Sequence, residues 1–142
     1  MNKKLEEELF EKYPNIFRGR TEPLTSNLMG YGFSCGDGWF KLISHMLEKI
    51  NLVQSLTGID VKALQCKEKF GGLRFYYSTS NGEDATLPQE ALTIGCDIIE
   101  DIVRKAESTA YRTCEICGDN GRNECINGWY TTVCSKHLKK GE

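Results

Sequence analysis

The segment "KEKFGGLRFYY", residues 67–77, places two glycines between a basic stretch and a run of aromatic side chains. Around it, residues 60–79 alternate between apolar and polar side chains, and a period of two is typical of β-strands. Gly71 and Gly72 interrupt this alternation, and glycine readily adopts the positive φ that both central residues of a type I′ turn require. The sequence therefore predicts a β-hairpin centred on the two glycines, followed by a polar loop at 78–84.

A helical pattern precedes this hairpin at the start of the chain. Residues 2–13 predict a first helix with Asn2 as its N-cap, and Pro14 ends it because the residue before a proline is disfavoured in the helical region. Residues 15–36 show no sustained period, so we expect an extended loop there.

A second helix is predicted within "CGDGWFKLISHMLEKINLV", residues 35–53, with Asp37 as its N-cap. His45 lies off the apolar stripe of this helix and is expected to be exposed. The stripe itself recurs at intervals of three and four residues and consists of Trp39, Ile43, Met46, Leu47, Ile50 and Val53.

A third helix is predicted from Pro88 to Ala110, with Thr86 and Gln89 spaced as a capping box. A chain of 142 residues, 39% of them hydrophobic, is long enough to bury a core. Three helices and a hairpin together predict an α+β domain over residues 1–110, followed by a smaller module at 111–142.

The most specific motif lies in this C-terminal module. "CEICG" at 114–118 and "CSKH" at 134–137 form a Cys-x2-Cys pair and a Cys-x2-His pair, separated by sixteen residues. Zinc prefers tetrahedral sets of sulfur and nitrogen donors, and a two-residue gap lets both side chains of a pair reach one ion. The sequence predicts a structural Zn²⁺ with four protein ligands, namely Cys114, Cys117, Cys134 and His137.

Residues 128–133, between the two pairs, predict a strand, and residues 135–142 are able to open a short helix. The order of knuckle, hairpin and helix resembles a treble-clef zinc finger. Four protein ligands leave no position for water on a tetrahedral ion, which argues against a catalytic zinc.

The sequence gives little support to an enzyme. Treble-clef nucleases place further histidines beside the finger, whereas the only other histidine here is His45. No spacing indicates a Ser-His-Asp, Cys-His or paired-carboxylate site, so a nuclease or other hydrolase is the less favoured interpretation. Cys125 either replaces a zinc ligand or has no metal role, and the lack of a partner at a recognised gap favours the second.

Composition indicates where the protein resides. The chain has seven cysteines, an odd number, and its N-terminus lacks the features of a secretory signal, which predicts reduced thiols in a cytoplasm. Three of them have no metal spacing and are expected to be small buried hydrophobes: Cys35, Cys66 and Cys96. No run of about 18 apolar residues is present, so no membrane span is expected.

The hairpin also carries side chains that bind phosphates and bases. The net charge of −2 argues against non-specific binding of long nucleic acids, but four cations and one acid lie between residues 62 and 74. A small anionic ligand needs no more than this local excess. The predicted ligand-binding set is Lys67, Lys69, Gly71, Gly72, Arg74 and Tyr76, with Asp37 as an acceptor for a base or ribose. An ordinary hairpin with a solvated basic edge is the alternative.

Three blocks, "GFSCGDGWFKLI", "KEKFGGLRFYY" and "AESTAYRTCEICG" followed by "GWYTTVCSKH", are together similar to a group of small, uncharacterised phage- and prophage-encoded proteins. The similarity covers roughly residues 30–137. It implies an accessory phage protein in a bacterial host cytoplasm, a setting in which small proteins often antagonise host defence, and it assigns no functional residue.

These observations predict a non-enzymatic protein, forming homo-oligomers, that sequesters a small anionic, nucleotide-like ligand such as an immune signal. The alternative is an adapter whose zinc finger and hairpin bind a host protein or structured nucleic acid.

Overall fold

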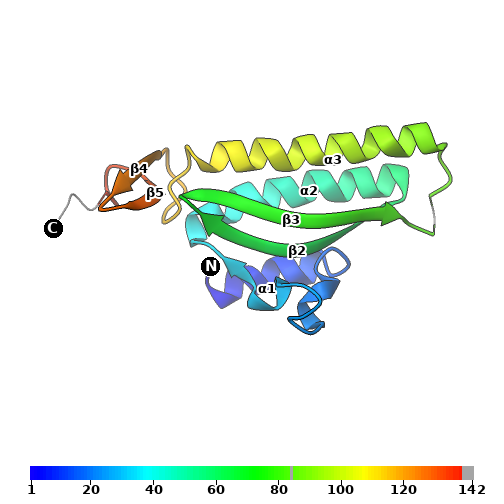
Figure 1. Ribbon diagram of the computed structural model, residues 1–142, viewed down its shortest axis with the longest axis horizontal. Coiled ribbons are helices and arrows are strands. Elements are labelled where there is room, and N and C mark those ends of the chain that lie inside the picture. The colour runs from blue at the N-terminus through cyan, green and yellow to red at the C-terminus, as the bar shows by residue number, and fades with distance from the viewer. Residues whose placement is uncertain (84, 139–142) are drawn as a thin grey trace.

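A three-stranded sheet lies at the centre of the computed structural model, which describes residues 1–83 and 85–138 (Figure 1). Strands β2 (Ile59–Lys69) and β3 (Gly72–Asn81) pair antiparallel, and the short strand β1 (Phe33–Ser34) pairs parallel with β2. The strand order is β1-β2-β3, so the predicted hairpin supplies the central strand and one edge strand.

The turn of this hairpin lies one residue earlier than predicted. Phe70 and Gly71 have φ values of 55° and 78°, and Lys69 pairs with Gly72. The two central residues are therefore Phe70 and Gly71, while Gly72 is the first residue of β3. The strand continues to Asn81, so the first half of the predicted polar loop is β-structure.

Three helices surround the sheet, as predicted: α1 (Lys3–Lys12), α2 (Phe40–Thr57) and α3 (Gln89–Ala110). Helices α2 and α3 pack against each other and against the hairpin, and α1 lies across the hairpin from them (Figure 1). The N-cap prediction for α1 is confirmed, because the Asn2 side chain accepts the backbone N–H of Leu5 at 3.0 Å.

The segment predicted as an extended loop contains more structure than its composition indicates. It holds two 3-10 turns, η1 (Arg18–Thr21) and η2 (Met29–Tyr31), and then β1. A third 3-10 turn, η3 (Asp37–Trp39), precedes α2, which begins at Phe40, later than predicted.

Two of the predicted helix caps are wrong. Asp37 makes no capping bond to α2; its two carboxylate oxygens accept the backbone N–H and the side-chain amide of Asn2, at 2.7 and 3.0 Å. The backbone N–H of Asn2 is the main reason that the pKa of Asp37 is lowered. At α3, Pro88 occupies the N-cap position and no side chain caps the helix, so the capping box of Thr86 and Gln89 does not form.

The apolar stripes of the helices face the sheet and form the main core. Trp39, Ile43, Leu47 and Ile50 are fully buried, whereas His45 is exposed, as predicted. Three rings from α1, the following loop and β1 pack with centroids 5.3–5.4 Å apart, namely Phe10, Phe17 and Phe33. Of the three cysteines without metal spacing, Cys35 and Cys66 are buried and Cys96 is half-buried.

A second hairpin, β4 (Arg122–Ile126) and β5 (Trp129–Val133), lies at one end of the molecule (Figure 1). It has a separate small core of Cys114, Val133 and Cys134, with Leu138 packed against it. Residues 135–137 form a turn, and residues 139–142 lie outside the described part of the chain. The predicted helix, and with it the treble clef, is therefore not shown.

Among the described residues, no helix has both the length and the apolar character that a membrane crossing requires.

Candidate metal centre

Two turns, one on each side of the second hairpin, bring the four predicted ligands together. Their donor atoms all lie within 4.8 Å of one another. The sulfurs of Cys117 and Cys134 are 3.7 Å apart, and His137 Nδ1 lies 3.7 Å from the Cys114 sulfur and 3.2 Å from that of Cys134. Sulfur ligands of a tetrahedral zinc lie about 3.8 Å apart, given Zn–S bonds of about 2.3 Å. The four side chains are thus placed as a metal site requires.

Local backbone structure explains this placement. In the first turn, the N–H of Gly118 donates to the carbonyl of Cys114 at 2.9 Å, and Gly118 has a φ of 83° that favours glycine. In the second turn, which directly follows β5, the N–H of His137 donates to the carbonyl of Cys134 at 3.1 Å. The first hydrogen bond encloses three residues and the second encloses two, and each turn brings the two donor atoms of its pair into one cluster.

The thiols influence one another strongly. Burial opposes ionisation of Cys114, but backbone N–H groups, first that of Cys117, hold the pKa of Cys114 at about 6. The N–H of Asp119 favours the Cys117 thiolate, yet burial and the neighbouring sulfurs raise the pKa of Cys117 to about 11. Three thiolates at this separation need a cation between them, and a divalent metal ion is such a cation.

Cys125 takes no part in this cluster. It lies exposed on β4, and the donor group found among the described residues contains only the four predicted ligands. Of the two interpretations of Cys125, the arrangement supports the one without a metal role.

The first turn of the metal module is held against the segment that precedes α2. Glu115 accepts the N–H of Gly36 through its side chain and the N–H of Gly38 through its carbonyl, both at 2.8 Å. The indole Nε1 of Trp39 donates to the carbonyl of Thr113 at 2.9 Å. A Cβ at Gly38 would lie 2.2 Å from the Cys114 carbonyl oxygen, so only glycine fits there. The "CGDGW" motif, residues 35–39, is therefore the surface against which the Cys114–Cys117 turn packs.

The second hairpin is held against the tip of the β2–β3 hairpin. Thr132, fully buried, donates its hydroxyl to the carbonyl of Gly71 at 2.6 Å, and Asn123 donates its side-chain amide to that of Phe70 at 3.1 Å. The Phe70 ring meets the Tyr130 ring edge-on, with centroids 6.3 Å apart. The tip of one hairpin is thereby fixed by the other.

The space at the two predicted ligand-binding glycines is filled by protein. A Cβ at Gly71 would lie 2.3 Å from Asn123 Nδ2, and one at Gly72 would lie 2.5 Å from the ring of Tyr111. Both glycines serve close packing and are not open to a ligand. No sequence pattern pointed to Glu115, Asn123, Thr132 or Tyr111, because their role depends on partners 37 or more residues away.

The remaining hairpin residues of the predicted ligand set share one face. Lys67 pairs with Arg74 across the strands and Lys69 pairs with Gly72, and directly paired residues point to the same side. Tyr76, two positions after Arg74, lies on this side too and is 43% exposed. We call Lys67, Lys69, Arg74 and Tyr76 the basic face.

The cations of the basic face lack acidic partners. In residues 1–83 and 85–138, no carboxylate forms an ion pair with Lys67, Lys69 or Arg74, whereas Lys62 on the same strand pairs with Glu22 at 2.8 Å. Arg74 donates to the hydroxyl of Tyr111 at 3.2 Å, and this hydrogen bond is the main reason that its pKa is raised.

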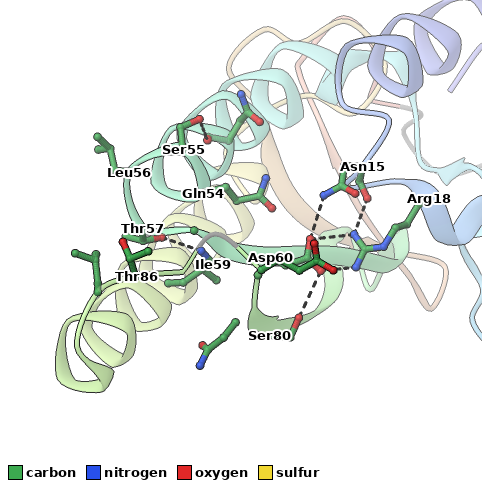
Figure 2. A pocket seen from close by; sticks show the side chains of 16 residues that line it. Asn15, Arg18, Gln54, Ser55, Leu56, Thr57, Ile59, Asp60, Ser80 and Thr86 are labelled. Carbon is green, nitrogen blue, oxygen red and sulfur yellow. Dashed lines mark hydrogen bonds and ion pairs between the residues drawn. The ribbon is translucent and has the colours of Figure 1, made fainter.

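Two grooves bear on ligand binding. A groove of about 470 Å³ beside β3 is lined by Arg74 and Tyr76 but also by Glu100 and Glu107. The larger groove, about 940 Å³, lies where α2 ends and β2 begins (Figure 2). Two of its charged side chains are paired with each other, since Asp60 forms an ion pair with Arg18 and also accepts from Asn15 at 3.0 Å.

Comparison of the chain with protein-family models, curated proteins and solved structures found no match. The similarity to phage-encoded proteins therefore stays a prediction.

Proposed function

We propose that Cys114, Cys117, Cys134 and His137 hold one structural Zn²⁺, and that the protein is a non-enzymatic module whose basic face binds the phosphates of single-stranded nucleic acid. The donor set supports zinc, because thiolate-rich tetrahedral sites are typical of this ion. With four protein donors the ion stabilises the fold and has no position left for a reacting water.

The observation on which the proposal rests is the unpaired charge of the basic face. Three cations lie on neighbouring positions of two strands, without acidic partners among the described residues. Lys67 and Lys69 are two residues apart on one strand, which separates their Cα atoms by about 6.7 Å. Such a row of cations matches a chain of phosphates better than it matches a single anion.

Aromatic rings lie at both ends of this row. Tyr76 lies beyond Arg74, and Phe70, 62% exposed, lies at the hairpin tip against Tyr130, which is 50% exposed. Exposed rings stack on unpaired bases, and proteins that bind single strands combine such rings with cations along the backbone. This combination favours a single strand over a duplex, whose bases are not free to stack.

The shape of the face favours an extended ligand over a small nucleotide. Small ligands bind in concave sites that bury most of their surface. The groove next to the basic face contains Glu100 and Glu107, whose charges repel phosphate. A small nucleotide shares the same chemistry, so the experiment must include it.

Fluorescence anisotropy of the zinc-loaded protein with a labelled 12-nucleotide oligothymidylate, titrated at several salt concentrations, tests the proposal. Three phosphate contacts predict a slope of about −2 for log K against log salt, since each contact with a single strand contributes about −0.7. We expect Lys69→Ala and Arg74→Ala each to weaken binding and to reduce the magnitude of the slope by about 0.7. Lys41 is an exposed lysine on α2, and Lys41→Ala is the control that should leave affinity and slope unchanged.

Competition with a cyclic dinucleotide and with ADP-ribose distinguishes the two sources of phosphate. If either small nucleotide binds and the oligonucleotide does not, the ligand of the basic face is a small nucleotide and not a single strand. Binding that is independent of salt, or equal in the Lys69→Ala and Arg74→Ala variants, would contradict a role for the basic face.

A further inference from the structure

The end of the molecule opposite the metal module carries large aliphatic side chains on its surface. Leu52 and Leu56 of α2 are 59% and 71% exposed, and Ile94 and Ile98 of α3 are 60% and 47% exposed. Each pair is four residues apart and lies on the side of its helix that faces away from the core.

These four residues lie at the same level of two neighbouring helices. A Cβ at Gly95 would lie 3.3 Å from Thr57 Cγ2, so the end of α2 is beside residue 95 of α3. The two helices run antiparallel, since the start of α2 meets the end of α3, where Trp39 donates to Thr113. Leu56 and Ile94 therefore flank this contact on the solvent side, and Leu52 and Ile98 follow one turn further along. We call these four residues the aliphatic block.

Single exposed leucines are common on protein surfaces, but a contiguous group marks an interaction site. Leu87, 40% exposed, extends the aliphatic block, because it lines the same groove as Leu56. Nothing in the metal site or the basic face involves this end of the molecule.

We propose that the aliphatic block is the interface of a homodimer, in which α2 of one protomer lies over α3 of its partner. Charge supports a second copy as the occupant. The outer side of α2 has exposed Lys41 and Lys49 against one acid, Glu48. The outer side of α3 around the block is acidic, with exposed Glu90, Asp97 and Asp101.

A two-fold axis that runs along the helices brings these unlike surfaces together, and the same patch of each protomer forms the interface. Leucines of α2 then meet isoleucines of the partner's α3. Lys49 lies eight residues before Thr57, and eight residues beyond Gly95 on α3 is Val103. Lys49 therefore lies level with residues 101–105 of the partner's α3, where Asp101 is the exposed acid and Arg104 and Lys105 are exposed cations. Asp101 pairs with Lys105 of its own helix at 2.9 Å, but both are highly exposed and such pairs are weak.

This arrangement is distinct from membrane binding. Anionic lipid surfaces attract cations, whereas the aliphatic block is bordered by Glu90, Asp97 and Asp101. It also places both metal modules at the same end of the dimer, so two basic faces are presented together.

Sedimentation velocity of the full-length, zinc-loaded protein between about 1 and 200 μM tests the interface, a range suited to micromolar affinity. We expect a reversible dimer, and at least tenfold weaker association in Leu52→Glu and in Ile98→Glu. Leu24→Glu is the matched control, because Leu24 is 48% exposed but lies outside the aliphatic block. Circular dichroism of each variant establishes that it is folded.

A charge exchange tests the geometry. Lys49→Glu and Asp101→Lys should each weaken the dimer, and the double variant should regain most of the wild-type affinity. A protein that stays monomeric at 200 μM, or a dimer that Leu52→Glu and Ile98→Glu leave unchanged, would overturn the proposal. Binding of the monomer to phosphatidylserine vesicles through the aliphatic block would overturn it as well. A dimer without rescue in the double variant would overturn the pairing of α2 with α3.

Discussion

Gly71 lies where the metal module meets the β2–β3 hairpin. A methyl group added there causes both backbone strain, because φ is positive, and a steric clash, and comparison with Gly128 separates the two effects. Gly71 and Gly128 both have positive φ, 78° and 83°, but a Cβ at Gly71 would lie 2.3 Å from Asn123 whereas one at Gly128 meets nothing within 4 Å. We expect Gly71→Ala to lower the free energy of unfolding by about 1–3 kcal/mol more than Gly128→Ala does. Urea unfolding of both zinc-loaded variants measures the difference, and equal losses would show that the second hairpin does not pack on Gly71.

The cysteines outside the metal site should differ in reactivity. Cys66 is buried, and contact with the Cys35 thiol, followed by burial itself, raises the pKa of Cys66 well above its ordinary value. A raised pKa keeps the thiol protonated at neutral pH, and the thiolate is the reactive form. In zinc-loaded protein at pH 7.5 we expect Ellman's reagent to modify exposed Cys125 first and Cys66 only after unfolding. Modification of Cys66 at the rate of Cys125 would contradict this account.

At the scale of elements, one buried hydroxyl, that of Thr132, contributes to the contact between the two hairpins. Thr132→Val keeps the shape of the side chain but leaves the Gly71 carbonyl without its 2.6 Å donor. Loss of a partner for a buried polar group costs about 1–3 kcal/mol. Thr131→Val, on the opposite side of β5 and only half-buried, is the control and should be nearly neutral. Thermal unfolding that shifts equally in both variants would show that this hydrogen bond does not hold the hairpins together.

Periodicity predicts the elements that are long. The three helices and the β2–β3 hairpin follow from spacings of three to four and of two residues, and the four metal ligands follow from two short gaps. β1 has no such signal, because a strand of two residues shows no period and depends on its parallel pairing with β2. The cap predicted at Asp37 was wrong because its carboxylate is bound by Asn2, 35 residues earlier.

At the candidate site too, the role of a glycine depends on partners that are distant in the sequence. Sequence alone permits a glycine to serve a turn, a ligand or a close packing contact. Only the fold brings Asn123 to Gly71 and Tyr111 to Gly72, and both contacts join segments that are far apart in the chain. Lys69 and Tyr76 of the basic face are exposed, and Lys67 and Arg74 are half-buried. The part of the predicted ligand site that reaches solvent is therefore the part without glycines.

At the scale of the whole molecule, the metal module has too small a core to be stable alone. Its buried cluster consists of Cys114, Val133 and Cys134 with Leu138 alongside, separate from the main core. Modules of this size usually need a metal or disulfides, and metal binding then contributes directly to folding. In the proposed function, one ion holds together the two turns that flank the second hairpin. The first turn contacts Gly38 and the hairpin itself contacts Gly71, so the ion also fixes the end of the molecule that bears the basic face.

Amide hydrogen exchange, compared between the zinc-loaded protein and the same protein refolded without metal under reducing conditions, tests this claim most directly. We predict one zinc ion per chain, and a loss of protection without it at the N–H groups of Gly38 and Glu115, which donate to the carbonyls of Glu115 and Thr132. The amides of α2 and α3 should keep their protection, since the main core does not involve the metal. A protein that binds no stoichiometric ion, or one whose protection at Gly38 and Glu115 is the same with and without zinc, would contradict the account.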